Sequence, residues 1–315
     1  MKQALLRLLT STPFDRLFGR WTAGRLPILM LHRFTERPQE GRTSAAALEA
    51  FLQQAADRGW QGWRLDQVIA ALDAGELPSR TFCLTVDDGY RDFAEVAFPI
   101  LQRYGVPATV FLTTDFVDGT MWNWWDRVIV AFQRSGAAEA TGFAHPFHAI
   151  EAWKQIPEAE KRQRVAELEA AVGASTEQAP EAVYQAMSWE TIAQLAAAGI
   201  EFGGHTQSHP ILSQIDDVQL EQEIGGSLQT IERHLGAPVR TFAYPNGRAE
   251  DFDERAVRML QATPLVGAVT TEARFLTIER GSDRWRIPRL VFPETALGQR
   301  SLLCGLEAAK ESWRS

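Results

Sequence analysis

Two adjacent carboxylates, Asp87 and Asp88, follow an apolar run over residues 82–86. The run has the length and β-branched content of a buried strand, and Gly89 after the two acids favours a loop at its carboxyl end. Parallel α/β folds place their chemistry in such loops. Two neighbouring carboxylates repel each other, and a cation bound beside them relieves that repulsion. An ordinary Asp-Gly turn is the alternative interpretation.

A second candidate lies far along the chain, where His205 and His209 stand four residues apart behind two glycines and before Pro210. Imidazole is the commonest ligand of transition metals, and two rings at this spacing can face one ion if the backbone coils locally. For the pair alone, a polar loop or a helix cap is the alternative. One carboxylate with two imidazoles leaves coordination positions open for water and substrate. The two stretches together therefore favour a catalytic metal.

These two stretches resemble the first and second motifs of the NodB-homology polysaccharide deacetylases, carbohydrate esterase family 4. Residues 85–89 match the first motif, residues 205–209 match the second, and the resemblance covers roughly residues 26–295. It implies a distorted (β/α) barrel in which Asp87 is the catalytic base. It also implies one divalent metal ion held by Asp88, His205 and His209. Zinc suits this ligand set best, and cobalt or nickel fits it too.

His32 ends an apolar run that predicts the first core strand, over residues 26–32. In some branches of the family a histidine at the end of such a strand acts as the general acid, and His32 resembles it. This role would let His32 protonate the departing amine. A core histidine with satisfied hydrogen bonds is the alternative.

Residues 241–247 predict a strand followed by a turn and resemble the third motif of the family. The proline and glycine of that motif shape one wall of the substrate groove, so the resemblance places Tyr244, Pro245 and Asn246 against the substrate. Asn246 stands where the family usually has a tyrosine, and its surroundings are expected to offer a backbone N–H to the reacting oxyanion.

The third motif also departs from the family at Ala243, where an arginine normally steadies the base aspartate. Either another arginine replaces it or the base is tuned differently. Arg286 and Arg289 lie near a late strand, and we expect Arg289 to take this catalytic supporting role. A surface salt bridge is the alternative for both.

Strand and helix alternate along most of the chain, as a parallel sheet requires. The apolar periodicity and cap residues predict strands at 108–112 and 200–202, and helices at 44–58, 65–74, 93–104, 188–198, 218–235 and 296–315. The alternation breaks between about residues 115 and 187, in a helical, charged stretch rich in tryptophan. We interpret it as an insertion beside the barrel. Trp124 and Trp125 can stack on sugar rings there, or simply pack the insertion against the barrel.

Composition narrows the range of functions. The 315 residues are 45% hydrophobic, as in an ordinary soluble domain, and the net charge of −8 argues against a general nucleic-acid binder. Residues 1–31 lack a secretory pattern, which makes a cytoplasmic location the expectation. Within them, residues 1–25 alternate basic and apolar residues and so predict an amphipathic helix. That helix either packs on the barrel or makes peripheral contact with a membrane surface.

The expected reaction is metal-dependent removal of an acetyl group, most readily an N-acetyl group, from a saccharide or polysaccharide precursor. An O-acetyl esterase or a non-sugar amide hydrolase on the same scaffold is one alternative. A non-catalytic saccharide-binding relative is another, because the third motif is altered at Ala243. Acetate release separates that last alternative from the first two.

Overall fold

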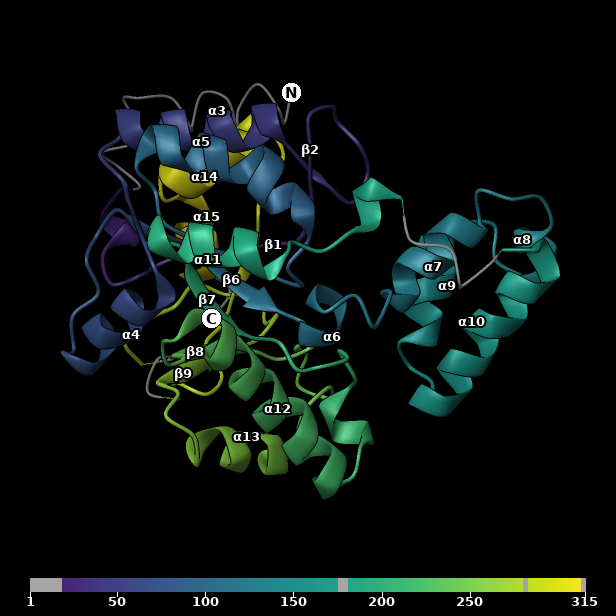
Figure 1. The fold of residues 1–315 in the computed structure, drawn as a ribbon. Helices are drawn as coiled ribbons and strands as arrows, with labels where there is room; N and C mark the ends of the chain where they lie inside the picture. Colours follow the sequence, from purple (N-terminus) through teal and green to yellow (C-terminus); the bar gives the residue numbers. More distant parts are fainter. Residues whose placement is uncertain (1–18, 175–180, 280–282, 313–315) are drawn as a thin grey trace.

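A parallel sheet forms the centre of the computed structural model, which describes residues 19–174, 181–279 and 283–312 (Figure 1). Along the sheet the order is β10-β1-β5-β6-β7-β8-β9, and β4 pairs with β5 beside this path. The strands are β1 (Ile28–Leu31), β4 (Gln61–Trp63), β5 (Thr81–Val86), β6 (Thr109–Leu112), β7 (Glu201–Gly204), β8 (Thr241–Ala243), β9 (Gly267–Val269) and β10 (Leu290–Val291).

The sheet curves until its two ends meet. Val269 at the end of β9 forms a parallel bridge with Ile287, and Leu290 in β10, three residues later, pairs with Leu29 of β1. One short segment thus connects the last strand of the path to the first. Because every pairing within the sheet is parallel, the carboxyl ends of all strands gather at one mouth. The predicted distorted (β/α) barrel is confirmed.

Helices cover the outside of the barrel, with α3, α5 and α14 packed together on one side and α12 and α13 on another (Figure 1). The side chains of Ser44 and Ser188 cap α3 and α11 by accepting hydrogen bonds from the backbone N–H groups of Ala47 and Thr191. These helices and turns are η1 (Gly19–Thr22), α3 (Ala45–Asp57), α4 (Leu65–Asp73), η2 (Phe93–Ala97), α5 (Phe98–Tyr104), α6 (Thr114–Val117), α11 (Trp189–Ala197), η4 (Leu212–Gln214), α12 (Asp217–Leu235), α13 (Glu254–Gln261), α14 (Ala296–Leu303) and α15 (Leu306–Ser312). A small parallel pair, β2 (Phe34–Thr35) and β3 (Thr43–Ser44), follows β1.

Two predicted helices differ in detail. The helix expected over 93–104 starts as a π-turn, η2, before α5 begins at Phe98. The single helix expected over 296–315 is two helices, because the chain turns at Gly305 with φ +85°, a conformation that suits glycine. The amphipathic helix expected within residues 1–25 falls mainly on residues 1–18, outside the described residues. Next to them, η1 packs its Trp21 against the cluster that contains Cys304 and Leu306.

The predicted insertion is a helical lobe with its own hydrophobic core, in which Val128, Ala131, Trp153, Val165 and Leu168 are buried together. Its helices are α7 (Trp124–Ala131), α8 (Ala137–Thr141), α9 (Pro146–Trp153) and α10 (Glu158–Val172), followed by the short turn η3 (Ala182–Tyr184). Figure 1 shows the lobe on the side toward which β6 points, which is the side of the barrel mouth. Among the described residues, no helix combines the length and apolar character needed to cross a membrane.

Candidate active site

Asp87 and Asp88 emerge from the carboxyl end of β5 into the barrel mouth, and both are almost fully buried. The chain turns sharply here, with φ +75° at Asp88 and φ +90° at Gly89. A Cβ atom on Gly89 would lie only 2.8 Å from a methyl carbon of Leu112. Glycine is therefore required after the two acids, and the turn points the two carboxylates in different directions.

The histidine motif follows β7, which continues through Gly203 and Gly204 and so is longer than the strand expected at 200–202. The two glycines let neighbouring strands come close, because a Cβ atom on Gly203 would meet the ring of Phe111 at 2.5 Å and the carbonyl oxygen of Thr241 at 2.7 Å. The motif thus enters the barrel mouth directly beside the end of β6.

A tight turn aims both imidazoles inward. Thr206 and His209 have φ values of +66° and +60°, and the hydroxyl oxygen of Thr206 accepts a hydrogen bond from the His209 N–H at 3.0 Å. The carboxylate of Glu223, on α12, accepts hydrogen bonds from the backbone N–H groups of Gln207 and Ser208 at 2.9 and 2.8 Å. Non-glycine residues seldom adopt positive φ, and at these positions the surrounding contacts hold them there.

Asp88, His205 and His209 form one buried cluster whose ligand atoms all lie within 4.8 Å of one another. Oδ1 of Asp88 is 3.7 Å from Nε2 of His205 and 3.8 Å from Nε2 of His209. Nδ1 of His205 lies 2.7 Å from the carbonyl oxygen of Ala243. Because a carbonyl only accepts, Nδ1 carries the proton and Nε2 presents its lone pair to the cluster.

The cluster fits a divalent metal ion. Within the described part of the chain, Oδ1 of Asp88 and Nδ1 of His209 are buried without a hydrogen-bond partner. Burial and the charge of Asp87 raise the pKa of Asp88 well above its usual range. Burial lowers the pKa of His205 and His209, so both imidazoles are neutral and able to act as ligands. A cation among these atoms would pair the orphaned carboxylate oxygen and favour its ionised form.

Asp87 lies beside this cluster and is held by Arg289. The guanidinium donates two parallel hydrogen bonds to the carboxylate, at 2.7 and 2.8 Å, and a third to the carbonyl oxygen of Thr270 at 2.9 Å. Burial favours the neutral acid, yet Arg289 and the nearby imidazoles hold the pKa of Asp87 well below its usual range. Arg286, the other candidate, forms surface ion pairs with Asp283 and Glu254 instead.

His32 stands at the open edge of the site, after the end of β1. Its Nε2 atom lies 3.7 Å from Oδ2 of Asp87, and 44% of its side chain is exposed. Burial of its inner face lowers the pKa of His32, an effect that the charge of Asp87 opposes. An imidazole between the Asp87 carboxylate and solvent is well placed to exchange protons with a bound molecule and with water.

The sequence analysis missed a buried network beside the site, centred on the hydroxyl of Tyr90. This hydroxyl donates to Oδ2 of Asp126 at 2.6 Å and accepts from Asn123 Nδ2 and Trp125 Nε1 at 2.8 and 2.9 Å. The Arg33 guanidinium lies 3.7 Å from the centre of the Tyr90 ring. Burial raises the pKa of Asp126 to about 6, against the attraction of Arg33. The sequence feature that could have pointed to this network is the position of Tyr90 directly after the Asp-Asp-Gly motif.

This network brings Trp125 against the cluster, with its ring centroid 4.7 Å from that of His209 at an interplanar angle of 65°. Trp124 packs inside the insertion, where the Lys161 ammonium lies 4.9 Å from its ring centroid. Of the two tryptophans predicted to meet substrate, only Trp125 thus lies at the site. It makes the insertion part of the wall around His209.

We expect Tyr90→Phe to lower the free energy of unfolding by about 1–3 kcal/mol, because three buried polar groups lose a shared partner. Urea unfolding measures the change. Tyr104→Phe is the matched control, since its hydroxyl bonds to Gln53 at an exposed position, and there the loss should stay below about 0.5 kcal/mol. Equal losses in the two variants would contradict the structural role of the Tyr90 hydroxyl.

The structure corrects the placement of Tyr244, which was expected to contact substrate. Its side chain is 1% exposed, its ring stacks on Phe252 at 3.8 Å, and its hydroxyl donates to the carbonyl oxygen of Trp285 at 2.9 Å. The ring thus packs on an apolar partner and the hydroxyl has its hydrogen bond, so Tyr244 is a residue of the core and does not face the groove. Pro245 is also buried, whereas Asn246 is half-buried at the mouth, with φ +57°.

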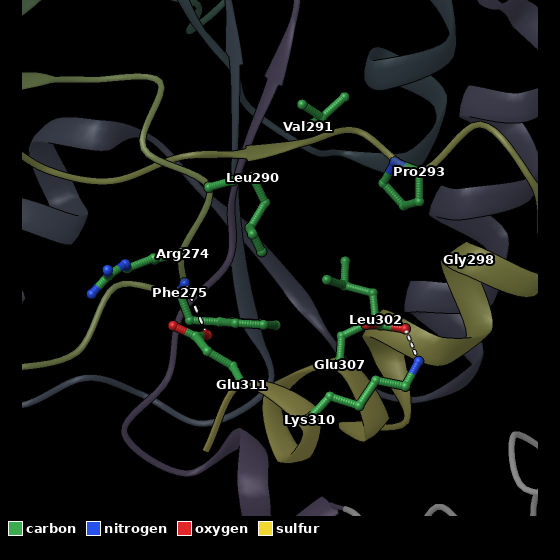
Figure 2. Close-up of a pocket in the computed structure, with 11 residues that line it drawn as sticks. Arg274, Phe275, Leu290, Val291, Pro293, Gly298, Leu302, Glu307, Lys310 and Glu311 are labelled. Atoms are coloured by element: carbon green, nitrogen blue, oxygen red, sulfur yellow. Dashed lines mark hydrogen bonds and ion pairs between the residues drawn. The ribbon is translucent and has the colours of Figure 1, made fainter. Parts of the chain in front are cut away.

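A separate pocket of about 480 Å³ lies outside the barrel, between β10 and the two C-terminal helices (Figure 2). Phe275, Leu290 and Leu302 contribute apolar surface to it, and Glu307 and Lys310 form an ion pair at its edge. Leu290 lines this pocket while its neighbour Arg289 points to Asp87, because successive strand residues face opposite sides. None of the predicted site residues lines the pocket.

Comparison with known proteins agrees with this geometry. The family model for polysaccharide deacetylases matches residues 74–266. A Bacillus subtilis protein, YxkH, whose name assigns it to the polysaccharide deacetylases, is 21% identical over 258 residues, which cover 82% of this chain and 68% of that protein.

Solved structures share the fold. The Streptococcus pyogenes deacetylase PplD in complex with acetate aligns with a TM-score of 0.63 and 19% identity, covering 89% of this chain and 98% of that one. IcaB from Ammonifex degensii aligns with a TM-score of 0.61 and 16% identity over 90% and 98% of the two chains. Since the family model spans more than half of the sequence, and the barrel has the NodB-homology architecture, this chain belongs to the polysaccharide deacetylase family.

Proposed function

We propose that this protein is a divalent-metal-dependent hydrolase that removes an N-acetyl group from a saccharide. The orphaned, buried Oδ1 of Asp88 between two neutral imidazoles is the observation that carries the proposal. The adjacent Asp87, ionised by its pairing with Arg289, supplies a base next to the same cluster. Family membership in the polysaccharide deacetylases supports the acetyl group and the saccharide.

Asp88, His205 and His209 would hold the ion, which supplies a Lewis acid for the acetyl carbonyl and its attacking water. Asp87 accepts the proton of that water on a carboxylate oxygen, while Arg289 fixes the orientation of the carboxylate. His32, whose Nε2 lies 3.7 Å from Oδ2 of Asp87, then relays this proton from Asp87 to the departing nitrogen, which leaves poorly as an anion. The ring of Trp125 keeps water away from one side of His209.

Metal analysis of the purified protein tests the proposal. We expect near one equivalent of zinc, or uptake of one on titration, and little in Asp88→Ala and His205→Ala. Acetate release from N-acetylated saccharides should require that metal and return when it is restored after chelation. A protein that takes up no metal, or that binds saccharides without releasing acetate, would contradict the proposal.

The role proposed for His32 makes a prediction that separates amide from ester substrates. His32→Gln should bind metal normally and lower kcat on an N-acetyl substrate by about 10²-fold. The loss on a matched O-acetyl substrate should be much smaller, because an alkoxide leaves without protonation more readily than an amine anion. His234→Gln, at an exposed position of α12 on the outside of the barrel, serves as the control. An equal loss on both substrates would contradict proton donation by His32.

A further inference from the structure

The insertion contacts opposite sides of the barrel mouth. On the β1 side, a Cβ atom on Gly41 would lie 3.3 Å from the ring of Phe147, at the start of α9. On the β8 side, Nη2 of Arg248 donates to Glu151, near the end of α9, at 3.0 Å. In the closed order of strands, β1 and β8 are separated by β5, β6 and β7 in one direction and by β9 and β10 in the other. One turn of α9 therefore lies between the loop after β1 and the loop after β8.

The loops between these two contacts also meet the insertion. After β5, the backbone N–H of Met187 donates to the carbonyl oxygen of Gly89 at 3.0 Å. After β6 the chain itself enters the lobe, and after β7 the ring of His209 meets Trp125. Contacts thus follow one another around the mouth from β1 through β5, β6 and β7 to β8.

The remaining sector, at β9 and β10, is bordered by exposed residues. Glu272 follows β9 and Glu294 follows β10, and both are exposed. His32, just after the end of β1, is 44% exposed, so solvent reaches the site beside β10, which pairs with β1. The insertion thus contacts the mouth from β1 to β8, and exposed residues border the mouth at β9 and β10.

A residue inside a long saccharide has chain on both sides, so it reaches a buried centre only through a groove that is open at two ends. A terminal residue needs one opening. We propose, on the basis of the proposed function, that the insertion acts as a roof that restricts deacetylation to the end of a saccharide chain or to a short saccharide. The substrate enters from the β9 and β10 side, with its acetylated terminal residue beneath α9.

The position of deacetylation tests this inference. The probes are N-acetylglucosamine oligomers of several linkages, from dimers to decamers, labelled at the reducing end so that mass spectrometry locates each free amine. We expect free amines at one chain end only, and acetate yields that follow the number of chains rather than the number of residues. Free amines spread through the interior would overturn the inference and leave the proposed function standing. No acetate from any oligomer would overturn both.

Opening the roof should change this pattern. Glu151→Ala removes the partner of Arg248 and is expected to raise the interior share of products by up to about five-fold. Glu49→Ala removes a comparable exposed ion pair, with Arg103, between α3 and α5 on the outside of the barrel, and should leave the product pattern unchanged. An unchanged pattern in both variants would contradict closure of the β8 side by this contact.

Discussion

Asp87→Asn is expected to lower kcat for acetate release by about 10²–10⁴-fold while the protein still binds the proposed metal ion. The amide keeps the shape of the carboxylate but is no longer a base. Asp87 lies outside the group of three ligand residues, and its two oxygens are occupied by Arg289. Metal content and single-turnover acetate release, measured on the same preparation, separate the two effects.

Asp88→Asn gives the opposite pattern and is the natural control. Asn presents a neutral oxygen at the same place, so metal affinity should fall and activity should partly return at high metal concentration. Thermal unfolding of both variants checks that neither simply fails to fold. If Asp87→Asn lost the metal and Asp88→Asn retained it, the roles assigned to the two aspartates would be exchanged.

The residues of the candidate site were predictable from sequence because they form motifs of particular residue types at short spacing. Asp87 and Asp88 end an unmistakable strand, and His205 and His209 follow a second one. That these two motifs meet at one site was harder to predict. β5 and β7 are not neighbours, since β6 lies between them, and only the curvature of the barrel brings Asp88 within 3.7 Å of the first imidazole. Here the resemblance to a family added what spacing alone does not contain.

The residues that sequence reasoning missed are those whose roles come from long-range packing. In the sequence, nothing distinguishes Tyr90, Asp126 and Arg33 from other aromatic and charged residues. They come into contact only because the insertion, which contains Asp126, packs against the barrel. For Tyr244, the sequence predicted a contact with substrate that the structure does not show. The residue was expected at the groove because it belongs to the third motif, but its ring stacks on Phe252 and is buried in the core. Neither outcome follows from local periodicity, because each depends on a partner distant in the sequence.

Replacing Arg289, the arginine that pairs with Asp87, is expected to have the second large effect, a loss of stability. Arg289→Gln should lower the free energy of unfolding at neutral pH by about 3–5 kcal/mol, because it leaves the buried carboxylate of Asp87 without its counter-charge. The Arg289 side chain is fully buried and meets both oxygens of that carboxylate. Arg286→Gln is the control. Its pairs with Asp283 and Glu254 lie near the surface, where an ion pair contributes up to about 1 kcal/mol.

The effect of Arg289→Gln should depend on pH in a definite direction. Arg289 lowers the pKa of Asp87 in the folded protein, so the stability it contributes is present above the pKa of an ordinary carboxyl group and is lost as the pH falls below it. The difference in unfolding free energy between parent and variant should therefore be largest near pH 7 and shrink below about pH 4. The acid limb of the kcat profile should also move to higher pH, because Asp87 becomes harder to ionise. Urea unfolding and acetate release across this range measure both effects. A difference that does not change with pH would show that Arg289 contributes packing alone and does not hold the charge of Asp87.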